Sequence, residues 1–193
     1  MRSADILVLF EETQALLVGH FQLTSGLHSE RYIQCARVLQ YPKYAEVICA
    51  EIAAHFRPLK IDAVLSPAFG GIVVGQEVGR QLGVRTMFTE RSNGMMQLRR
   101  GFEVANNERI LVCEDVVTTG GSVHEVCGIV KKAGGTIVGV GAVVDRSGGK
   151  HLLENFFAAV ALNVETYDPK ECPLCQNGVP VLKPGSRLNH PVV

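Results

Sequence analysis

Several features that would place the chain in a specialised class of protein are missing from its 193 residues. Nineteen basic and nineteen acidic residues cancel to a net charge of zero, which argues against bulk nucleic-acid binding. No apolar run approaches the ~20 residues needed to cross a bilayer. Acidic residues also come too early in residues 1–14 for a secretory signal. We therefore expect a cytoplasmic protein that has neither a nucleic-acid nor a membrane partner.

The six cysteines do not form the pattern of a disulfide framework. Four stand singly in apolar or helical contexts, where cysteine usually behaves as a small buried hydrophobe. The other two form Cys172-Pro-Leu-Cys175, in an irregular tail that we assign to residues 168–193. One C-x-x-C supplies two zinc ligands, whereas a structural zinc site needs four. The nearest histidines, His151 and His190, do not have the spacing of a zinc-ribbon motif. A reduced turn, a zinc pair shared across a dimer and a redox pair are the alternatives.

The most informative stretch is residues 109–123, which read RILVCEDVVTTGGSV. Its short apolar run predicts a strand buried on both faces. Two carboxylates, Glu114 and Asp115, come next, and a glycine-containing loop then leads into a helical segment. Glycines let successive N–H groups turn inward, and the helix N-terminus adds a positive field. We therefore predict a seat for a phosphate monoester. The residues of this seat are Thr118, Thr119, Gly120, Gly121 and Ser122.

The acidic pair needs its own explanation, because carboxylates repel a phosphate. Glu114 and Asp115 fit better as acceptors for two neighbouring ribose hydroxyls, or as outer-sphere partners of a magnesium ion. Phosphate, vicinal diol and acid pair together describe a ribose 5-phosphate. The alternative is a chance acidic turn followed by an ordinary capped helix. The stretch contains neither the G-K-S/T of a Walker A loop nor a G-x-G-x-x-G motif.

Alternation of apolar strands, glycine turns and helices predicts an α/β protein with a doubly wound parallel sheet. In such sheets ligands bind beyond the carboxyl ends of the strands. Segments 66–71, 90–91, 114–122 and 145–146 all fall at such ends, which predicts one composite site. We also expect a helix over 3–18, a hairpin or two short strands within 21–34 and a strand over 156–167.

Two further segments are candidate anion sites, each with a plainer alternative. The sequence SPAFGG repeats the strand, glycine loop and helix order, so Ala68, Phe69 and Gly70 could hold a second anion or form a plain turn. Residues 91–100 interrupt the periodic pattern. Their arginines suit the clamping of phosphate oxygens, or are scattered over a solvated surface hairpin. These arginines are Arg91, Arg99 and Arg100.

The order of apolar run, E-D, two apolar residues and T-T-G-G-S resembles the 5-phosphoribosyl-1-pyrophosphate (PRPP) loop of type I phosphoribosyltransferases. Over nearly its whole length the chain is similar to the orotate phosphoribosyltransferases. FQLTSGLHSERYIQ, at 21–34, resembles the hood that closes over orotate, and Ser25 lies in it. SPAFGG resembles the family's pyrophosphate loop. VVDR places Arg146 where the family has an arginine for the orotate carboxylate or ring carbonyls.

The resemblance implies a phosphoribosyltransferase domain over residues 1–167, with the hood within 1–40. It implies transfer of the phosphoribosyl group from PRPP to orotate, with Mg²⁺, in a homodimer whose loop 91–100 reaches the partner's site. Asp115, Glu114 and Arg91 would then serve catalysis. Pyrophosphate would meet the 68–70 loop and the two later arginines.

The chain departs from the family pattern at three places. Thr24 replaces a common lysine, Phe69-Gly70 replaces Tyr-Lys, and the 91–100 loop contains neither lysine nor histidine. We expect Arg99 and Arg100 to replace the missing cations. The alternatives are a phosphoribosyltransferase for another nucleobase and a non-catalytic regulator that senses PRPP.

Overall fold

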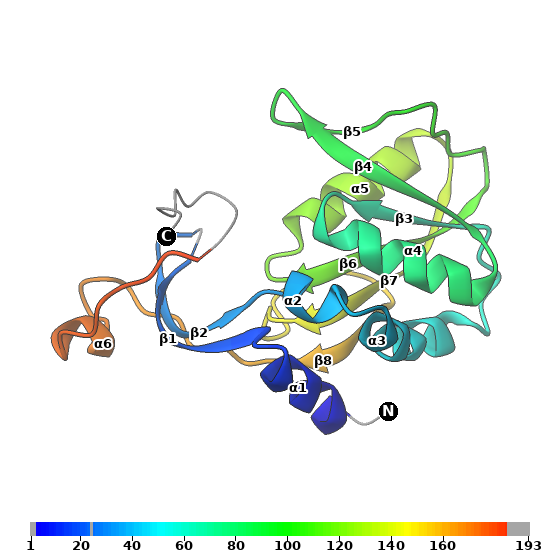
Figure 1. Ribbon diagram of the computed structural model, residues 1–193. Coiled ribbons are helices and arrows are strands. Elements are labelled where there is room, and N and C mark those ends of the chain that lie inside the picture. Colours follow the sequence, from blue (N-terminus) through cyan, green and yellow to red (C-terminus); the bar gives the residue numbers. More distant parts are fainter. Residues whose placement is uncertain (1–2, 24, 185–193) are drawn as a thin grey trace.

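The computed structural model describes residues 3–23 and 25–184, and its centre is a six-stranded sheet (Figure 1). The strand order is β5-β4-β3-β6-β7-β8, in which every neighbouring pair is parallel except the antiparallel pair β4–β5. The central position of β6 agrees with its continuous apolar run, because such a strand is covered on both faces. The strands are β3 (Ala63–Pro67), β4 (Arg85–Ser92), β5 (Met95–Leu98), β6 (Arg109–Val117), β7 (Thr136–Asp145) and β8 (Phe156–Ala161).

Helices cover both faces of this sheet, which confirms the predicted doubly wound α/β class (Figure 1). One apolar core lies between the sheet and four helices, with Phe10, Ile48 and Val74 among its buried residues. A second core lies on the other face beneath a single helix, which contributes Val123 and Val126. The first group comprises α1 (Ser3–Glu12), α2 (Ala36–Leu39), α3 (Pro42–Phe56) and α4 (Gly70–Leu82), and the single helix is α5 (Gly121–Lys132).

A small antiparallel hairpin of β1 (Leu16–Gln22) and β2 (His28–Ile33) stands at one end of the sheet (Figure 1). The chain that follows β8 returns along this hairpin and includes the short helix α6 (Pro173–Gln176). Two backbone hydrogen bonds join His28 to Tyr167, and the Leu182 N–H donates to the His20 carbonyl at 2.7 Å. The described part of the tail therefore packs against the β1–β2 hairpin, which contains most of the segment that resembles the hood.

Two sequence predictions extended elements too far. The helix expected over 3–18 ends at Glu12, because Leu16 already pairs with Ile33 as the first residue of β1. The strand expected over 156–167 ends at Ala161, which lies opposite Asp145, the last residue of its neighbour β7. In both cases strand pairing, which depends on distant residues, decides where the element ends.

The segment between β4 and β5 is a tight hairpin. Asn93 and Gly94 form its turn with φ angles of +52° and +78°. Positive φ at two successive residues is the requirement of a type I′ turn, for which Asn-Gly is the preferred sequence. The backbone of this segment therefore forms a surface hairpin, which was one of the two alternatives for residues 91–100. None of the helices in the described ranges is long and apolar enough to span a membrane.

Candidate active site

The glycine turn after β6 forms a hollow at the N-terminus of α5. Gly120 adopts φ +77°, and the first intrahelical hydrogen bond runs from the His124 N–H to the Gly120 carbonyl at 2.8 Å. The N–H groups of the first helical residues therefore have no acceptor within the helix, and they stand at the positive end of its dipole. All five predicted phosphate-seat residues line this hollow of about 260 Å³. Its size and donors suit a phosphate group.

The acidic pair lies between this hollow and the loop that precedes α4. A Cβ atom added to Gly70 would lie 2.1 Å from Asp115 Oδ2, and one added to Gly71 would lie 3.1 Å from Glu114 Oε1. Both carboxylates therefore face the same pair of glycines, and Glu114 also lines the phosphate hollow. The two predicted anion loops thus meet at the acidic pair, as expected for adjacent strand ends. The peptide bond between Ala68 and Phe69 is cis, and Phe69 is exposed.

Glu114 and Asp115 occupy different environments although they are neighbours in sequence. Only 8% of Glu114 is exposed, and burial raises its pKa to about 9, with the Asp115 charge acting in the same direction. Its Oε1 accepts a hydrogen bond from the Asp115 N–H at 3.0 Å. Asp115 is half-buried, and its Oδ1 accepts from the Val116 N–H at 2.9 Å. With this raised pKa Glu114 favours its protonated form at neutral pH, so it can donate a hydrogen bond, whereas the sequence predicted it as an acceptor.

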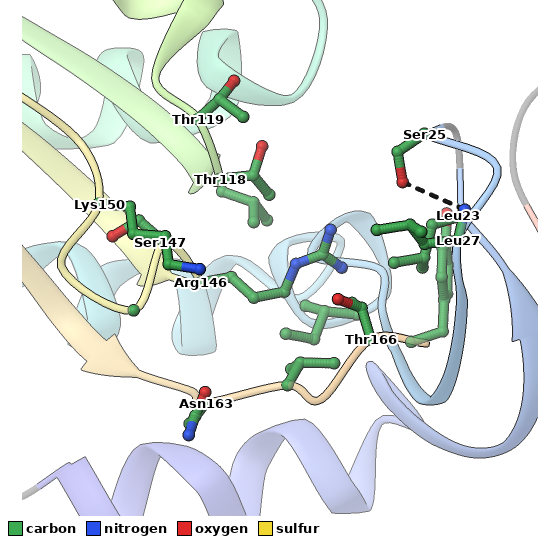
Figure 2. A pocket seen from close by; sticks show the side chains of 15 residues that line it. Leu23, Ser25, Leu27, Thr118, Thr119, Arg146, Ser147, Lys150, Asn163 and Thr166 are labelled. Atoms are coloured by element: carbon green, nitrogen blue, oxygen red, sulfur yellow. Dashed lines mark hydrogen bonds between the residues drawn. The ribbon is translucent and has the colours of Figure 1, made fainter. Parts of the chain in front are cut away.

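A larger cavity of about 790 Å³ adjoins the phosphate hollow (Figure 2). Val116, Thr118 and Thr119 line both spaces, so a single ligand can extend from one into the other. The walls come from the hood on one side and from the loops after β7 and β8 on the other. Ser25 lies on the hood side, as expected, where its Oγ accepts a long hydrogen bond of 3.5 Å from the Leu27 N–H. Thr24 lies outside the described residues.

Arg146 enters the middle of this cavity (Figure 2). Its backbone N–H donates to the Val117 carbonyl at 2.8 Å, which ties the start of its loop to the phosphate turn. In the described part of the chain its guanidinium has no hydrogen bond and no carboxylate partner. Partial burial lowers the pKa of Arg146, because desolvation disfavours its charge. A half-buried cation without a counter-ion is a site that favours an anionic ligand.

The three loop arginines occupy different positions relative to the phosphate hollow and the larger cavity of their own chain. Arg91 lies on the rim of the phosphate hollow, where its guanidinium forms two hydrogen bonds with Glu125. Arg99 and Arg100 both pair with Glu90, at 3.0 and 2.9 Å, and line neither space. Within one chain the structure therefore brings Arg91 to the site but not the other two.

Several cavity residues were missed by sequence reasoning. Tyr32 comes from the hood, Lys150 from the loop after β7, and Asn163 and Thr166 from the segment after β8. Burial raises the pKa of Tyr32, so its hydroxyl stays protonated and can donate. Of these, only Lys150 had a signal, since it ends the glycine-rich turn SGGK directly after VVDR.

Comparisons with known proteins agree with this geometry. The family model described as phosphoribosyl transferase domain matches residues 38–157. A curated orotate phosphoribosyltransferase from Chlorobaculum parvum is 57% identical over 190 residues, which is 98% of each chain. Another from Caldicellulosiruptor bescii is 52% identical over 180 residues, or 93% of this chain and 95% of its own. The crystal structure of orotate phosphoribosyltransferase from Aeropyrum pernix is similar in fold, with a TM-score of 0.70 at 21% identity over 81% of this chain and 93% of that one.

Proposed function

The chain belongs to the orotate phosphoribosyltransferase family, within the phosphoribosyltransferases, and from this we propose that it transfers the 5-phosphoribosyl group from PRPP to orotate. The products are orotidine 5'-monophosphate and pyrophosphate, in a step of pyrimidine biosynthesis. The observation that supports orotate over other bases is Arg146. Its guanidinium, which has no partner among the described residues, lies in a cavity continuous with the phosphate hollow and favours a base that carries a negative charge.

Each part of the ligand has a place in this proposal. The 5-phosphate takes the hollow at the start of α5, where hydroxyls of Thr118, Thr119 and Ser122 join the free N–H groups. The ribose lies beside Glu114 and Asp115, between that hollow and the larger cavity. The orotate carboxylate pairs with Arg146, whose side chain extends toward Leu23 and Leu27 of the hood in Figure 2. Lys150 lines the same cavity and adds a second positive charge for the base.

The reaction is a displacement at the anomeric carbon. The bond from that carbon to a pyrophosphate oxygen breaks, a bond to the ring nitrogen N1 of orotate forms, and N1 loses its proton. Positive charge develops on the ribose and negative charge on the leaving group, so catalysis requires positioning and charge stabilisation without a protein nucleophile. Asp115 stabilises the positive charge on the ribose, and protonated Glu114 donates to a ribose hydroxyl.

Magnesium fits this donor set as an ion that arrives with the substrate. Among the described residues, Asp115 offers carboxylate oxygens at the site, and no cluster of three carboxylates forms a closed cage. Mg²⁺ is typically held by one or two carboxylates together with substrate phosphates. Asp115 is the residue that would hold it. When bound, the ion would neutralise charge on the pyrophosphate.

The ion pair that Arg91 forms with Glu125 is weak, and this supports a role for Arg91 in binding a phosphate. Its partner Glu125 lies at the rim of the phosphate hollow, and both side chains are more than 40% exposed. An exposed ion pair of this kind contributes about 0–1 kcal/mol. A phosphate can therefore replace Glu125 as the partner of Arg91 at small energetic cost.

We further propose a cytoplasmic homodimer in which the β4–β5 hairpin reaches the partner's site. The hairpin arginines support this, because Arg99 and Arg100 are 51% and 61% exposed and both form ion pairs with Glu90, while Arg100 also lies over the Phe88 ring. Mixing an Arg99→Ala/Arg100→Ala chain with an Asp115→Asn chain tests it. Hairpins that act in the partner's site restore part of the activity in the mixed dimers. Hairpins that act in their own chain restore none.

The assay of the proposed function uses purified protein, PRPP and Mg²⁺ with orotate, uracil or adenine in separate reactions. Loss of orotate absorbance and release of pyrophosphate are followed together. We expect turnover with orotate and far less with the two neutral bases. Turnover with adenine or uracil but not orotate would assign the chain to another base. PRPP binding without turnover on any base would support the non-catalytic alternative.

A further inference from the structure

Four side chains of the types that bind metals meet between the β1–β2 hairpin and α6, and the proposed reaction uses none of them. His20 lies on β1 and His28 begins β2, while Cys172 directly precedes α6 and Cys175 lies within it. One ligand atom from each lies within 4.8 Å of all the others. None of the four lines the phosphate hollow or the larger cavity. The segment that carries the cysteines lies along the hood hairpin in Figure 1.

The distances among these atoms are close to those of a tetrahedral centre. His20 Nε2 lies 3.6 Å from Cys172 Sγ and 3.7 Å from Cys175 Sγ. His28 Nδ1 lies 3.3 Å from Cys175 Sγ and 2.9 Å from His20 Nε2. Zinc bonds of about 2.0–2.3 Å separate neighbouring ligand atoms by about 3.3–3.8 Å. Of these four pairs, the two imidazole nitrogens are the one pair closer than this range, and they would have to move apart by a few tenths of an ångström to admit the ion.

The orientation of His20 is already fixed in the way that a zinc ligand requires. Its Nδ1 lies 2.7 Å from the Val179 carbonyl oxygen, which can only accept, so Nδ1 carries the proton and donates. Nε2 is then an unprotonated nitrogen whose lone pair points into the cluster. A ligating histidine almost always donates its other ring N–H to such an acceptor. His20, His28 and Cys172 are each less than 7% exposed.

The backbone holds both sides of the cluster together independently of any ion. The Leu182 N–H donates to the His20 carbonyl at 2.7 Å, and the Gln22 N–H donates to the Leu182 carbonyl at 2.7 Å. His28 and Tyr167 exchange two hydrogen bonds of 2.9 Å. The fold therefore brings the C-x-x-C turn to two histidines that lie far from it in the chain. His20 and Cys172 are 152 positions apart, and His28 and Cys175 are 147 positions apart.

We propose that His20, His28, Cys172 and Cys175 bind one structural zinc ion that fastens the tail to the hood hairpin. Two thiolates and two imidazoles in a tetrahedral arrangement select zinc over magnesium, which prefers oxygen ligands. All four positions are filled by protein, so the site is structural rather than catalytic. The loop between the two histidines carries Leu23 and Leu27 of the base cavity, and the ion thus supports the wall that closes over the base.

The competing explanation is a metal-free network. In it His28 Nδ1–H donates to His20 Nε2, and the two thiols stay protonated or join in a disulfide. The two explanations predict different metal contents for the same protein. Neither prediction depends on catalytic activity, so the test separates failure of the zinc site from failure of the proposed function.

The test measures zinc by elemental analysis in protein produced without a metal-binding tag and purified under reducing conditions. We expect one zinc ion per chain in the wild type and in Cys127→Ser, a matched control whose half-buried thiol lies on α5 outside the cluster. The Cys172→Ser/Cys175→Ser variant should lose the ion. Cobalt exchanged into the wild type should show the strong visible bands of a tetrahedral centre and a thiolate charge-transfer band.

Three results would overturn the proposal. The first is wild-type protein that contains little zinc, takes up none when zinc is supplied and gives no thiolate–cobalt band. The second is full zinc content in the double-serine variant. The third is a Cys172–Cys175 disulfide in protein purified with zinc and without oxidant. If the double-serine variant does not fold, the cobalt spectrum of the wild type decides the question alone.

Discussion

Replacement of Arg146 tests the assignment of the base pocket. Arg146→Ala removes the guanidinium, and Arg146→Met removes the charge while keeping an apolar stem of similar length. In the described chain the guanidinium makes no hydrogen bond or ion pair, and partial burial already disfavours its charge. Neither replacement therefore removes a native polar contact. We expect the free energy of unfolding to fall little in either variant, and least in Arg146→Met.

The effect on orotate can be estimated from the contact that is lost. A hydrogen bond to a charged group contributes about 1.5–3 kcal/mol. Because each ~1.4 kcal/mol is a factor of ten, kcat/KM for orotate should fall by about 10- to 150-fold. The PRPP phosphate binds at the other end of the site, so KM for PRPP should change much less. Preference for orotate over uracil should shrink by a similar factor, because uracil lacks the carboxylate.

Steady-state kinetics with each substrate varied in turn measure this effect. Arg57→Ala is the matched control, since within the described ranges the only hydrogen bond of this exposed side chain goes to the Gln81 carbonyl at 3.1 Å, and Arg57 lies outside both cavities. Equal increases in KM for orotate and PRPP would refute the placement of the base beside Arg146. An unchanged orotate KM would refute it as well.

Three further predictions concern the acidic pair. Asp115→Asn should lower kcat by about 10²-fold, the usual cost of losing one transition-state charge contact, with unchanged circular dichroism; near-normal rates would remove Asp115 from the reaction. Gly70→Ala places a Cβ 2.1 Å from Asp115 Oδ2, so it should displace this carboxylate and reduce kcat/KM at least tenfold. Gly128→Ala is the control, because its added Cβ meets nothing within 4 Å, and it should leave kcat/KM unchanged. Equal kinetics in the two variants would contradict the close approach of Gly70 and Asp115. Burial raises the pKa of Glu114 to about 9 in the folded protein, from about 4.3 in the unfolded chain. The folded state therefore holds the Glu114 proton more tightly than the unfolded state does. The stability that this proton contributes is fully present below about pH 4.3 and is lost as the pH rises to about 9. Urea unfolding should therefore show wild-type stability falling relative to Glu114→Gln by up to about 1.4 kcal/mol per pH unit in that window, and a difference independent of pH would contradict the raised pKa.

The sequence was most informative where structure depends on neighbouring residues. An apolar run followed by glycines and a helical segment is a local pattern, and it predicted the strand, the turn from Thr118 to Ser122 and the helix that the structure contains; that this turn holds a phosphate stays a prediction. The rule that parallel strands end at one edge of a sheet also brought Arg146 and the acidic pair together before any coordinates. Asn93-Gly94 is an equally local signal, because this dipeptide favours the tight turn of the surface hairpin that was one of the two alternatives for residues 91–100.

What the sequence could not provide depends on contacts between distant segments. Tyr32 lines the base cavity only because the hood folds over the strand ends. The two histidines of the proposed zinc site stand alone in the sequence, and nothing near them resembles a metal motif. The C-x-x-C pair supplies only two ligands, and the histidines nearest to it in sequence, His151 and His190, lack the spacing of a zinc ribbon, so the sequence leaves a zinc pair as one of three alternatives. His151 instead lies 3.8 Å from Asp145, and His190 is outside the described residues.

The most direct test of the central claim is a crystal structure of the protein with orotidine 5'-monophosphate. We expect its phosphate to accept hydrogen bonds from the backbone of the turn that ends at Ser122, with the ribose beside Asp115 and the ring carboxylate against Arg146. A nucleotide bound in the opposite direction, or one whose phosphate lies outside that turn, would contradict the account.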